Sequence, residues 1–291
     1  MGYRNFRLGG IDVLLYRPPR GGRQLPAPSV GAESPETLSS APVVAHSAAP
    51  ADETAAQALQ RRVDAIEWYH TIDLGHGIAT PGWFDLRESV SRYPIPARLD
   101  GLRVLDLATF DGFWAFELEK RGAAEVVALD IDSFNEVDMS PRLRRSKDPA
   151  YLSRKLGDGF RLAHEALGSK VQRVVCNLYD LSPERLGMFD LVFISDVLLH
   201  LMNPMKALAN VASVTRGQAL INDVYNPKLP GTLMSYESGI NHNTWWDMGF
   251  GALQQMVIDA GFNDVRLHDR FELGYRGEAP TLWKASFVAR P

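Results

Sequence analysis

Apolar residues occur along the chain in short runs of strand-forming residues, separated by stretches with the 3.6-residue spacing of amphipathic helices. This alternation predicts an α/β fold with a doubly wound, Rossmann-like, mostly parallel sheet of seven strands. The expected strands are 102–105, 125–129, 171–176, 189–194, 218–222, 262–268 and 282–289. The expected helices are 113–119, 151–167, 204–214 and 253–260. Residues 189–194 are almost entirely apolar, as expected for a strand that is buried on both faces of a parallel sheet.

The chain before the first of these strands divides into two parts. Residues 1–51 comprise a head with five arginines and one acid up to residue 24, in which 13–16 have the character of a short strand, and a Pro-, Ala- and Ser-rich tether. Such a tether buries too little apolar surface to offset its ordering entropy, so we expect it to be flexible. Residues 52–100 are expected to hold a helix, capped by Asp52 and followed by a lid loop, and residues 101–291 the Rossmann-like domain.

The expected lid, residues 68–87, is rich in glycines and turn residues. Its aromatic, histidine and arginine side chains suggest a loop that helps to form a site. These side chains are Trp68, His70, Trp83, Phe84 and Arg87. The alternative is that the aromatic residues only cap the core.

The most distinctive stretch is LRVLDLATFDGFWAFE, residues 102–117. A strand runs into a carboxylate, Asp106, then into a turn with small residues at Ala108 and Gly112, and then into a helix, which is half of a nucleotide-binding unit. The carboxylate in place of a glycine-rich turn suits a ligand that carries a positive charge. Asp130 ends the second strand 24 residues later, at the distance from which an acid reaches a ribose diol.

Composition narrows the functional classes. The 291 residues have a formal net charge of −4, which gives no overall attraction to nucleic acid. One cysteine, Cys176, excludes an intrachain disulfide and fits a reducing compartment, and no membrane span or signal peptide is recognisable, so we expect a cytoplasmic protein. No residue spacing suggests a metal site. A nucleophile elbow and a Walker loop are also absent.

From about Asp52 onward the chain resembles the class I S-adenosylmethionine-dependent methyltransferases. The stretches WYHTIDLGHGIATPGWFDLR, VLDLATFDGFWAFE and NTWW…LQQMVIDAGF together resemble a narrower group that contains the bacterial tRNA wobble-uridine methyl- and carboxymethyltransferases. The resemblance implies S-adenosylmethionine as cofactor and S-adenosylhomocysteine as product. Only the acid and the last glycine of the family's acidic-x-Gly-x-Gly-x-Gly turn match literally, because Ala108 and Phe110 stand where two glycines are usual.

The resemblance also implies a role for each cofactor-binding position. The turn with Asp106, Ala108, Phe110 and Gly112 would hold the methionine end. Asp130 would bind the ribose hydroxyls. The remaining positions are Ile131 and Leu178, which would enclose the adenine, and Ser195 and Asp196, which would lie beside the methionine moiety.

Two departures from the group concern the donor. Users of the carboxylated cofactor have a tyrosine and an arginine where this chain has Leu199 and Lys284. Leucine cannot donate a hydrogen bond, and lysine lacks the planar fork that grips a carboxylate. We therefore expect ordinary methyl transfer rather than carboxymethyl transfer.

Methyl transfer to a hydroxyl group needs a base, and a histidine titrating near its ordinary value of ~6.5 serves at neutral pH. The candidates are His200 after the fourth strand, His242 in the loop after the fifth, and His70 in the lid. Trp83, Phe84, Arg87, Trp245 and Trp246 are candidates for the wall of the acceptor pocket. For each histidine the alternative is a structural hydrogen bond, and for each aromatic residue it is core packing.

Three functions remain open from the sequence. The leading prediction is an O-methyltransferase that acts on a small molecule or a sugar. The second is a tRNA-modifying enzyme, for which the arginine-rich head and the basic cluster of residues 142–147 would contact phosphates. The third is a methyltransferase-like protein that binds the cofactor without catalysis. The sequence does not indicate an oligomeric state.

Overall fold

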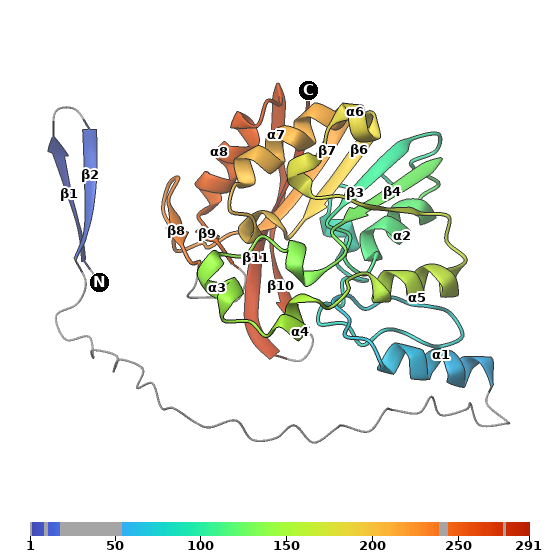
Figure 1. Cartoon of the computed structure of the whole chain (residues 1–291). Coiled ribbons are helices and arrows are strands. Elements are labelled where there is room, and N and C mark those ends of the chain that lie inside the picture. The colour runs from blue at the N-terminus through green and yellow to red at the C-terminus, as the bar shows by residue number, and fades with distance from the viewer. Residues whose placement is uncertain (1, 9–10, 18–53, 239–243, 276–277) are drawn as a thin grey trace, which may run out of the picture. The chain divides into compact units, whose positions relative to one another are not determined.

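The computed structural model of the chain describes residues 2–8, 11–17, 54–238, 244–275 and 278–291 (Figure 1). The chain divides into two compact units, Met1–Ala49 and Pro50–Pro291. The first contains an antiparallel hairpin of β1 (Gly2–Leu8) and β2 (Ile11–Arg17), which is longer than the strand expected at 13–16. The predicted tether and the predicted cap, Asp52, lie outside the described residues.

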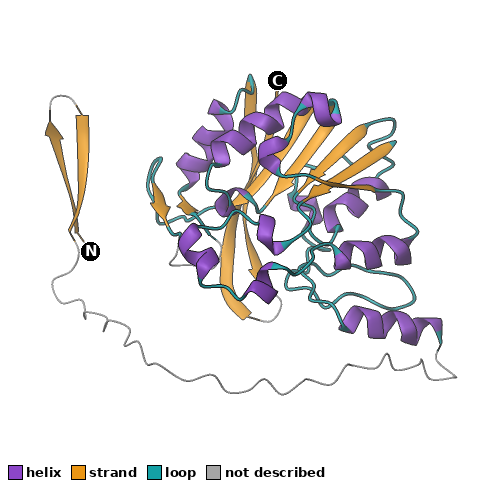
Figure 2. Cartoon of the chain, viewed as in Figure 1, coloured by secondary structure: helices purple, strands orange, loops and turns teal. Residues whose placement is uncertain are grey.

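The second unit is built on a seven-stranded sheet with the strand order β10-β11-β7-β6-β3-β4-β5 (Figure 2). Its strands are β3 (Arg103–Leu107), β4 (Glu125–Asp130), β5 (Gln172–Val175), β6 (Phe189–Ser195), β7 (Thr215–Val224), β10 (Asp264–Tyr275) and β11 (Glu278–Arg290). The five neighbouring strands β5, β4, β3, β6 and β7 run parallel to one another, whereas β11 pairs antiparallel with both β7 and β10. The predicted Rossmann-like sheet of mostly parallel strands is therefore confirmed.

Helices cover both faces of this sheet, as Figure 1 shows. Along β3, the side chains of Leu105 and Leu107 pack into one core, with α7 (Pro204–Val214) and α8 (Phe250–Asp259), while Val104 packs into the other, with α2 (Phe113–Lys120) and α5 (Asp158–Leu167). This alternation follows from the two-residue period of a strand. Shorter helices complete the fold: α1 (Ala55–Asp64), α3 (Pro141–Arg145), α4 (Pro149–Leu152) and α6 (Pro183–Leu186).

Several elements differ from their predicted bounds. The helix expected at 151–167 is divided into α4 and α5, because Gly157 between them adopts a left-handed conformation with φ of 85°. The helical spacing from residue 59 to 69 continues past the true end of α1, whose N-cap is Thr54 in a capping box with Gln57. The long loop after β7 contains a small antiparallel pair, β8 (Met234–Tyr236) and β9 (Trp246–Met248).

The segment between α1 and β3 is part of the core. Trp68, Ile72, Phe84 and Leu86 are almost fully buried in the same cluster as the helices α2 and α5. The expected lid loop is thus packed against the α2 face of the sheet. Across the described ranges, no helix has the length and the apolar character needed to cross a membrane.

Candidate functional site

The turn between β3 and α2 has an unusual backbone. Ala108, Phe110 and Gly112 have φ values of 56°, 49° and 90°, so every second residue of the turn is left-handed. A Cβ atom on Gly112 would lie 2.5 Å from the ring of Phe116, so this position requires glycine. Ala108 and Phe110 adopt the same kind of conformation although they carry side chains, at a cost of roughly 1–3 kcal/mol each.

Asp130, at the end of β4, fastens this turn. Its Oδ2 accepts a hydrogen bond from the backbone N–H of Phe110 at 2.8 Å, and its Oδ1 accepts one from the N–H of Ile131 at 2.7 Å. Burial raises the pKa of this carboxyl to about 6, although both hydrogen bonds act in the opposite direction. Asp130 therefore orders the turn and lies at the carboxyl edge of the sheet, where the sequence predicted it.

Asp106 lies in β3 beneath the same turn and is almost completely buried. Its Oδ2 has no hydrogen-bond partner among the described residues. Burial raises the pKa of the carboxyl to about 7. A buried acid with an unsatisfied oxygen favours a ligand that brings a positive charge or a donor.

A cavity of about 260 Å³ opens beside the turn, over the ends of β3, β4 and β6. Six of the nine predicted cofactor positions line it, namely Ala108, Phe110, Asp130, Ile131, Ser195 and Asp196. A small cavity of about 70 Å³ shares Ala108, Asp130 and Ile131 with it and is also lined by Leu178. The structure thus brings together residues that lie up to 88 positions apart in the sequence, from Ala108 to Asp196.

His70 also lines this cavity and forms a dyad with Asp111. The Nδ1 atom of His70 lies 2.6 Å from Oδ1 of Asp111, and both side chains are almost fully buried. The other carboxylate oxygen, Oδ2, accepts hydrogen bonds from the backbone N–H groups of Tyr69 (3.1 Å) and His70 (2.7 Å). An imidazole ring that donates its single N–H from Nδ1 to this carboxylate carries its lone pair on Nε2. No hydrogen bond to Nε2 is recorded within the described ranges.

The backbone around His70 is held on two further sides. The hydroxyl of Thr80 donates to the carbonyl oxygen of His70 at 2.7 Å, and the N–H of Phe84 donates to the carbonyl of Tyr69 at 2.9 Å. Gly82 approaches so closely that an added Cβ would lie 2.0 Å from the carbonyl carbon of His70. These contacts fix the dyad on a packed scaffold. Sequence reasoning missed Asp111, although it stands inside the singled-out turn.

A second buried polar cluster lies at the end of β6. Lys284, from β11, is completely buried, and its Nζ donates to Tyr93 Oη at 3.0 Å, to Ser195 Oγ at 3.2 Å and to Asp196 Oδ2. Burial acts to lower the pKa of Lys284, but the charge of Asp196 and the bond to Tyr93 outweigh it and raise that pKa well above its usual range. Asp196 has a left-handed backbone with φ of 55°, and its Oδ1 is buried without a partner.

Asp223, at the end of β7, completes this cluster and was not predicted. Its Oδ2 accepts from the N–H of Leu198 at 2.9 Å, and it is fully buried. Burial, together with the negative charge of Asp196, raises its pKa to about 7.

The predicted pocket residues are divided among different places. Trp83 is 57% exposed and lines a larger cavity of about 460 Å³, which adjoins the first. Phe84 is buried in the core, and Arg87 forms an ion pair with Asp85 at the surface. His200 lines the 260 Å³ cavity with His70, whereas His242 lies outside the described residues.

Trp245 and Trp246 belong to neither of these two cavities. The indole N–H of Trp245 donates to the backbone carbonyl of Asp138 at 2.7 Å, and the buried ring supports the segment before α3. Trp246 lines a separate cavity with Leu199. Within the described ranges, no group of three or more His, Cys, Asp or Glu side chains is placed to hold a metal ion.

Comparisons with known proteins concern the domain and its fold. Residues 105–221 match the family model described as a methyltransferase domain. A search of curated proteins finds no significant match. The N-terminal domain of EvdMO1, solved in the presence of S-adenosylhomocysteine and D-fucose, is similar with a TM-score of 0.53 at 16% identity, over 81% of this chain and 97% of that chain.

Two further structures are similar. Full-length EvdMO1 gives a TM-score of 0.51 at 16% identity, with 81% of this chain covering 47% of that one. The 1,6-didemethyltoxoflavin-N1-methyltransferase of Burkholderia thailandensis gives 0.44 at 16% identity, over 66% of this chain and 72% of that one, which is too distant to carry an argument. At these identities the similarities to EvdMO1 bear on the fold.

Proposed function

We propose that this chain, of which residues 105–221 match a methyltransferase domain, transfers a methyl group from S-adenosylmethionine to a hydroxyl group of a small molecule or sugar. The observation that carries the proposal is the His70–Asp111 dyad, whose histidine lines the cavity at the ends of β3, β4 and β6. The same cavity has the acidic groups that a cationic cofactor requires. We place the reaction in the cytoplasm, because the one cysteine, Cys176, is a free thiol.

The residues of the cavity fit the cofactor's chemistry. Asp130 is positioned to accept from ribose hydroxyls through the lone pairs that its two backbone bonds leave. The unpartnered Oδ1 of Asp196 suits the ammonium group of the methionine moiety. Ile131 and Leu178 supply an apolar lining for the adenine. Bound in this way, S-adenosylmethionine supplies an electrophilic methyl group.

The dyad supplies the base. Asp111 holds the imidazole in one orientation and one tautomer, so that Nε2 accepts the proton of the acceptor hydroxyl. The oxygen–methyl bond forms as the sulfur–methyl bond breaks, the bonding pair remains on sulfur, and the charge on the imidazolium is balanced by Asp111. The proton then passes to solvent. Burial of both side chains keeps water from competing for the bond between Nδ1 and Asp111.

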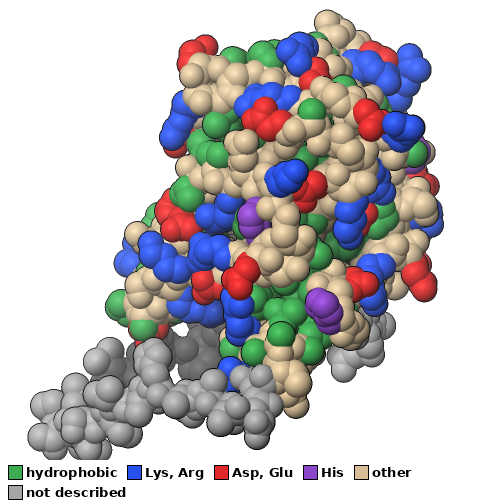
Figure 3. Space-filling view, turned by 90° about the vertical axis from the view of Figure 1, so that its right-hand side faces the viewer, with side chains coloured by type: hydrophobic (Ala, Val, Ile, Leu, Met, Phe, Trp, Pro, Cys, Tyr) green, Lys and Arg blue, Asp and Glu red, His purple; other side chains and the backbone are tan. Residues whose placement is uncertain are grey.

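The tRNA alternative rests on group resemblance and on the basic residues around α3. Arg144 in that cluster donates to backbone carbonyls of Asn135 and Val137, each at 2.7 Å, and so serves the local fold. Lys147 stacks on Tyr151. On the face shown in Figure 3, acidic and basic side chains are interspersed. A small acceptor is therefore the better-supported proposal.

The test is incubation with methyl-labelled S-adenosylmethionine and a fractionated cell extract, with label scored in RNA, lipid and small-molecule pools. We expect label in the small-molecule pool. Label in RNA that weakens steeply with salt would favour the tRNA-modifying function instead. Tight binding of S-adenosylhomocysteine without transfer to any pool would favour the non-catalytic alternative.

Matched histidine variants identify the base. His70→Gln should lower transfer by about 10²–10⁴-fold and leave S-adenosylhomocysteine affinity within about threefold. His200→Gln, in the same cavity, is the comparison, because it removes an imidazole without touching the dyad. If His200→Gln abolishes transfer and His70→Gln does not, the assignment of the dyad is wrong.

A further inference from the structure

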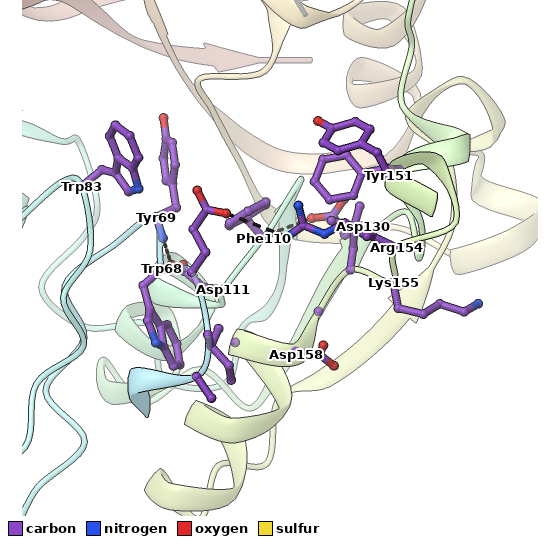
Figure 4. Close-up of a pocket in the computed structure, with 17 residues that line it drawn as sticks. Trp68, Tyr69, Trp83, Phe110, Asp111, Asp130, Tyr151, Arg154, Lys155 and Asp158 are labelled. Carbon is purple, nitrogen blue, oxygen red and sulfur yellow. Dashed lines mark hydrogen bonds and ion pairs between the residues drawn. The ribbon is translucent and has the colours of Figure 1, made fainter. Parts of the chain in front are cut away.

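The 460 Å³ cavity adjoins the 260 Å³ cavity. Asp111 of the dyad lines the larger cavity, and His70 lines the smaller one. Five residues line both of them, namely Tyr69, Phe110, Asp130, Phe134 and Leu156. Figure 4 shows Phe110 between one side formed by Trp83 and Tyr69 and an opposite side formed by Tyr151 and Arg154. A volume of this size is typical of small-molecule sites. The larger cavity is therefore placed to hold an acceptor next to the proposed base.

Phe110 is an unexpected residue for its position. Its φ of 49° is a conformation that glycine adopts freely and a bulky residue adopts only under strain. Its ring is 42% exposed, so burial of the ring in the core does not account for the choice. The strained backbone instead presents the ring to the cavity, where it contacts the ring of Tyr69 at a centroid distance of 5.6 Å. Strain of this kind is concentrated at ligand sites.

Trp83 is the second exposed ring on this cavity, and its position is coupled to the dyad. Gly82 before it lies against the His70 backbone, and Phe84 after it pairs with the backbone of residues 69–71. The backbone of Trp83 therefore lies between two residues, Gly82 and Phe84, that pack on the backbone around His70. An exposed tryptophan at 57% on a rigid support is typical of a ring that stacks on a ligand.

The charged side chains that line the larger cavity argue against an anionic acceptor. Its two basic residues already have partners, since Arg154 stacks on Phe134 and Tyr151 and pairs with Glu67, and Lys155 pairs with Asp132. The acids on the lining outnumber the bases and are Glu67, Asp111, Asp130 and Asp158. A neutral ligand avoids repulsion from this lining.

We propose that the larger cavity binds a neutral, planar aromatic acceptor, clamped by Phe110, Trp83 and Tyr69, whose phenolic hydroxyl is the group that is methylated. This inference rests on the proposed methyltransferase function and names the acceptor class for it. A phenol ionises near ~10, far more readily than an aliphatic alcohol, so a histidine base is well matched to it. Stacking on flat ring faces also discriminates against a saturated ring of equal size.

The test compares 2-naphthol with decahydro-2-naphthol, which has the same carbon skeleton but no flat face. Binding of each to the full chain saturated with S-adenosylhomocysteine is measured by calorimetry. We expect 2-naphthol to bind at least tenfold more tightly. Phe110→Gly and Trp83→Ala should each remove most of that preference. Leu267→Ala is the control, because Leu267 lies on β10, outside the cavity, and is as exposed as Phe110. This variant should leave the preference for 2-naphthol unchanged.

Phe110→Gly is a safe variant, because glycine relieves the strained φ and keeps the N–H that Asp130 binds. Equal binding of the two probes, or an unchanged preference in both cavity variants, would overturn the inference. If the unmodified chain does not bind S-adenosylhomocysteine, the proposed function itself is refuted. Methylation of 2-naphthol by the unmodified chain, and its loss in Phe110→Gly, would support both.

Discussion

The side chains of Lys284 and Asp196 form an ion pair at the edge of the 260 Å³ cavity. Lys284 is completely buried, and Ser195 and Tyr93 complete its set of hydrogen bonds. Its charge neutralises one of two neighbouring acids, the partly buried Asp196 and the fully buried Asp223. One oxygen of Asp196 is held by the lysine, and the other remains without a partner beside the cavity.

This pairing bears on which donor the protein uses. A carboxylated cofactor needs a cation, but Lys284 is committed to Asp196, Arg87 is paired with Asp85, and Leu199 has no donor. A carboxylate left without a cation in a partly dry cavity costs several kcal/mol. We expect S-adenosylmethionine to bind at least as tightly as its carboxylated form in a competition titration. Preference for the carboxylated donor by tenfold or more, about 1.4 kcal/mol, would contradict this.

Removal of the lysine should destabilise the fold. Lys284→Met leaves Asp196 and Asp223 buried without a counter-ion, so we expect the free energy of unfolding to fall by about 3–5 kcal/mol in chemical denaturation. The double variant Lys284→Met, Asp196→Asn removes charges of both signs and should recover part of that loss. A double variant no more stable than Lys284→Met would show that the ion pair is not the cause.

The buried acids predict a pH dependence of cofactor affinity. The pKa of Asp106 is about 7 because burial disfavours its charge, and a cationic ligand favours the ionised form. Affinity for S-adenosylmethionine should therefore weaken as the pH falls below 7, by up to about tenfold per pH unit. Asp106→Asn should bind weakly with a shallower pH dependence, while Asp264→Asn, at the surface, should behave as the unmodified chain. Calorimetric titration of the three chains with S-adenosylmethionine between pH 5.5 and 8 tests this prediction.

The raised pKa of Asp106 also makes the stability of the fold depend on pH. Cofactor affinity should rise with pH, whereas stability should fall. The folded protein holds the proton of Asp106 up to about pH 7, whereas an unfolded chain releases it near ~3.9. The stabilisation from this proton is complete below about pH 4 and is lost as the pH rises through 7. Asp106→Asn should therefore melt at a higher temperature than the unmodified chain at pH 8. A variant that melts lower at pH 8 would indicate that ionised Asp106 stabilises the fold.

Loss of the acid at the end of β4 should weaken cofactor binding. Asp130→Ala removes the acceptors for the ribose hydroxyls and for the N–H of Phe110, and hydrogen bonds to charged groups contribute roughly 1.5–3 kcal/mol. We expect S-adenosylhomocysteine affinity to fall by about ten- to a hundredfold in calorimetry. Asp132→Ala, two residues on and outside the cavity lining, is the control. Unchanged affinity in Asp130→Ala would refute the assignment of the ribose site.

The second unit should fold without the first. A chain that begins at Asp52 keeps the capping box of Thr54 and Gln57 that starts α1, and both hydrophobic cores lie between Val63 and Ala289. We expect its melting temperature to lie within about 3 °C of that of the full chain. An insoluble product, or one that melts more than 10 °C lower, would show that the hairpin β1–β2 stabilises the second unit.

Local sequence pattern was sufficient to predict the sheet, and together with the family resemblance it predicted where cofactor-binding residues would lie. Each central strand is a short apolar run, and parallel strands end at a common edge, so Asp106, Asp130 and Asp196 could be placed together without coordinates. The predicted ends of strands and helices were less accurate. The helical spacing at residues 66 and 69 continues beyond Asp64, but those side chains are used in packing after the helix has ended.

The dyad and the buried ion pair depended on tertiary structure. His70 and Asp111 are 41 residues apart, and Asp196 and Lys284 are 88 apart, and no local periodicity links such positions. Packing of the 68–86 segment brings the candidate His70 against the carboxylate of Asp111. A charged side chain such as Lys284 can be buried only where the folded chain supplies its counter-ion and hydrogen-bond acceptors, so the environment that gives these residues their chemistry exists only after the sheet and its covering segments have packed.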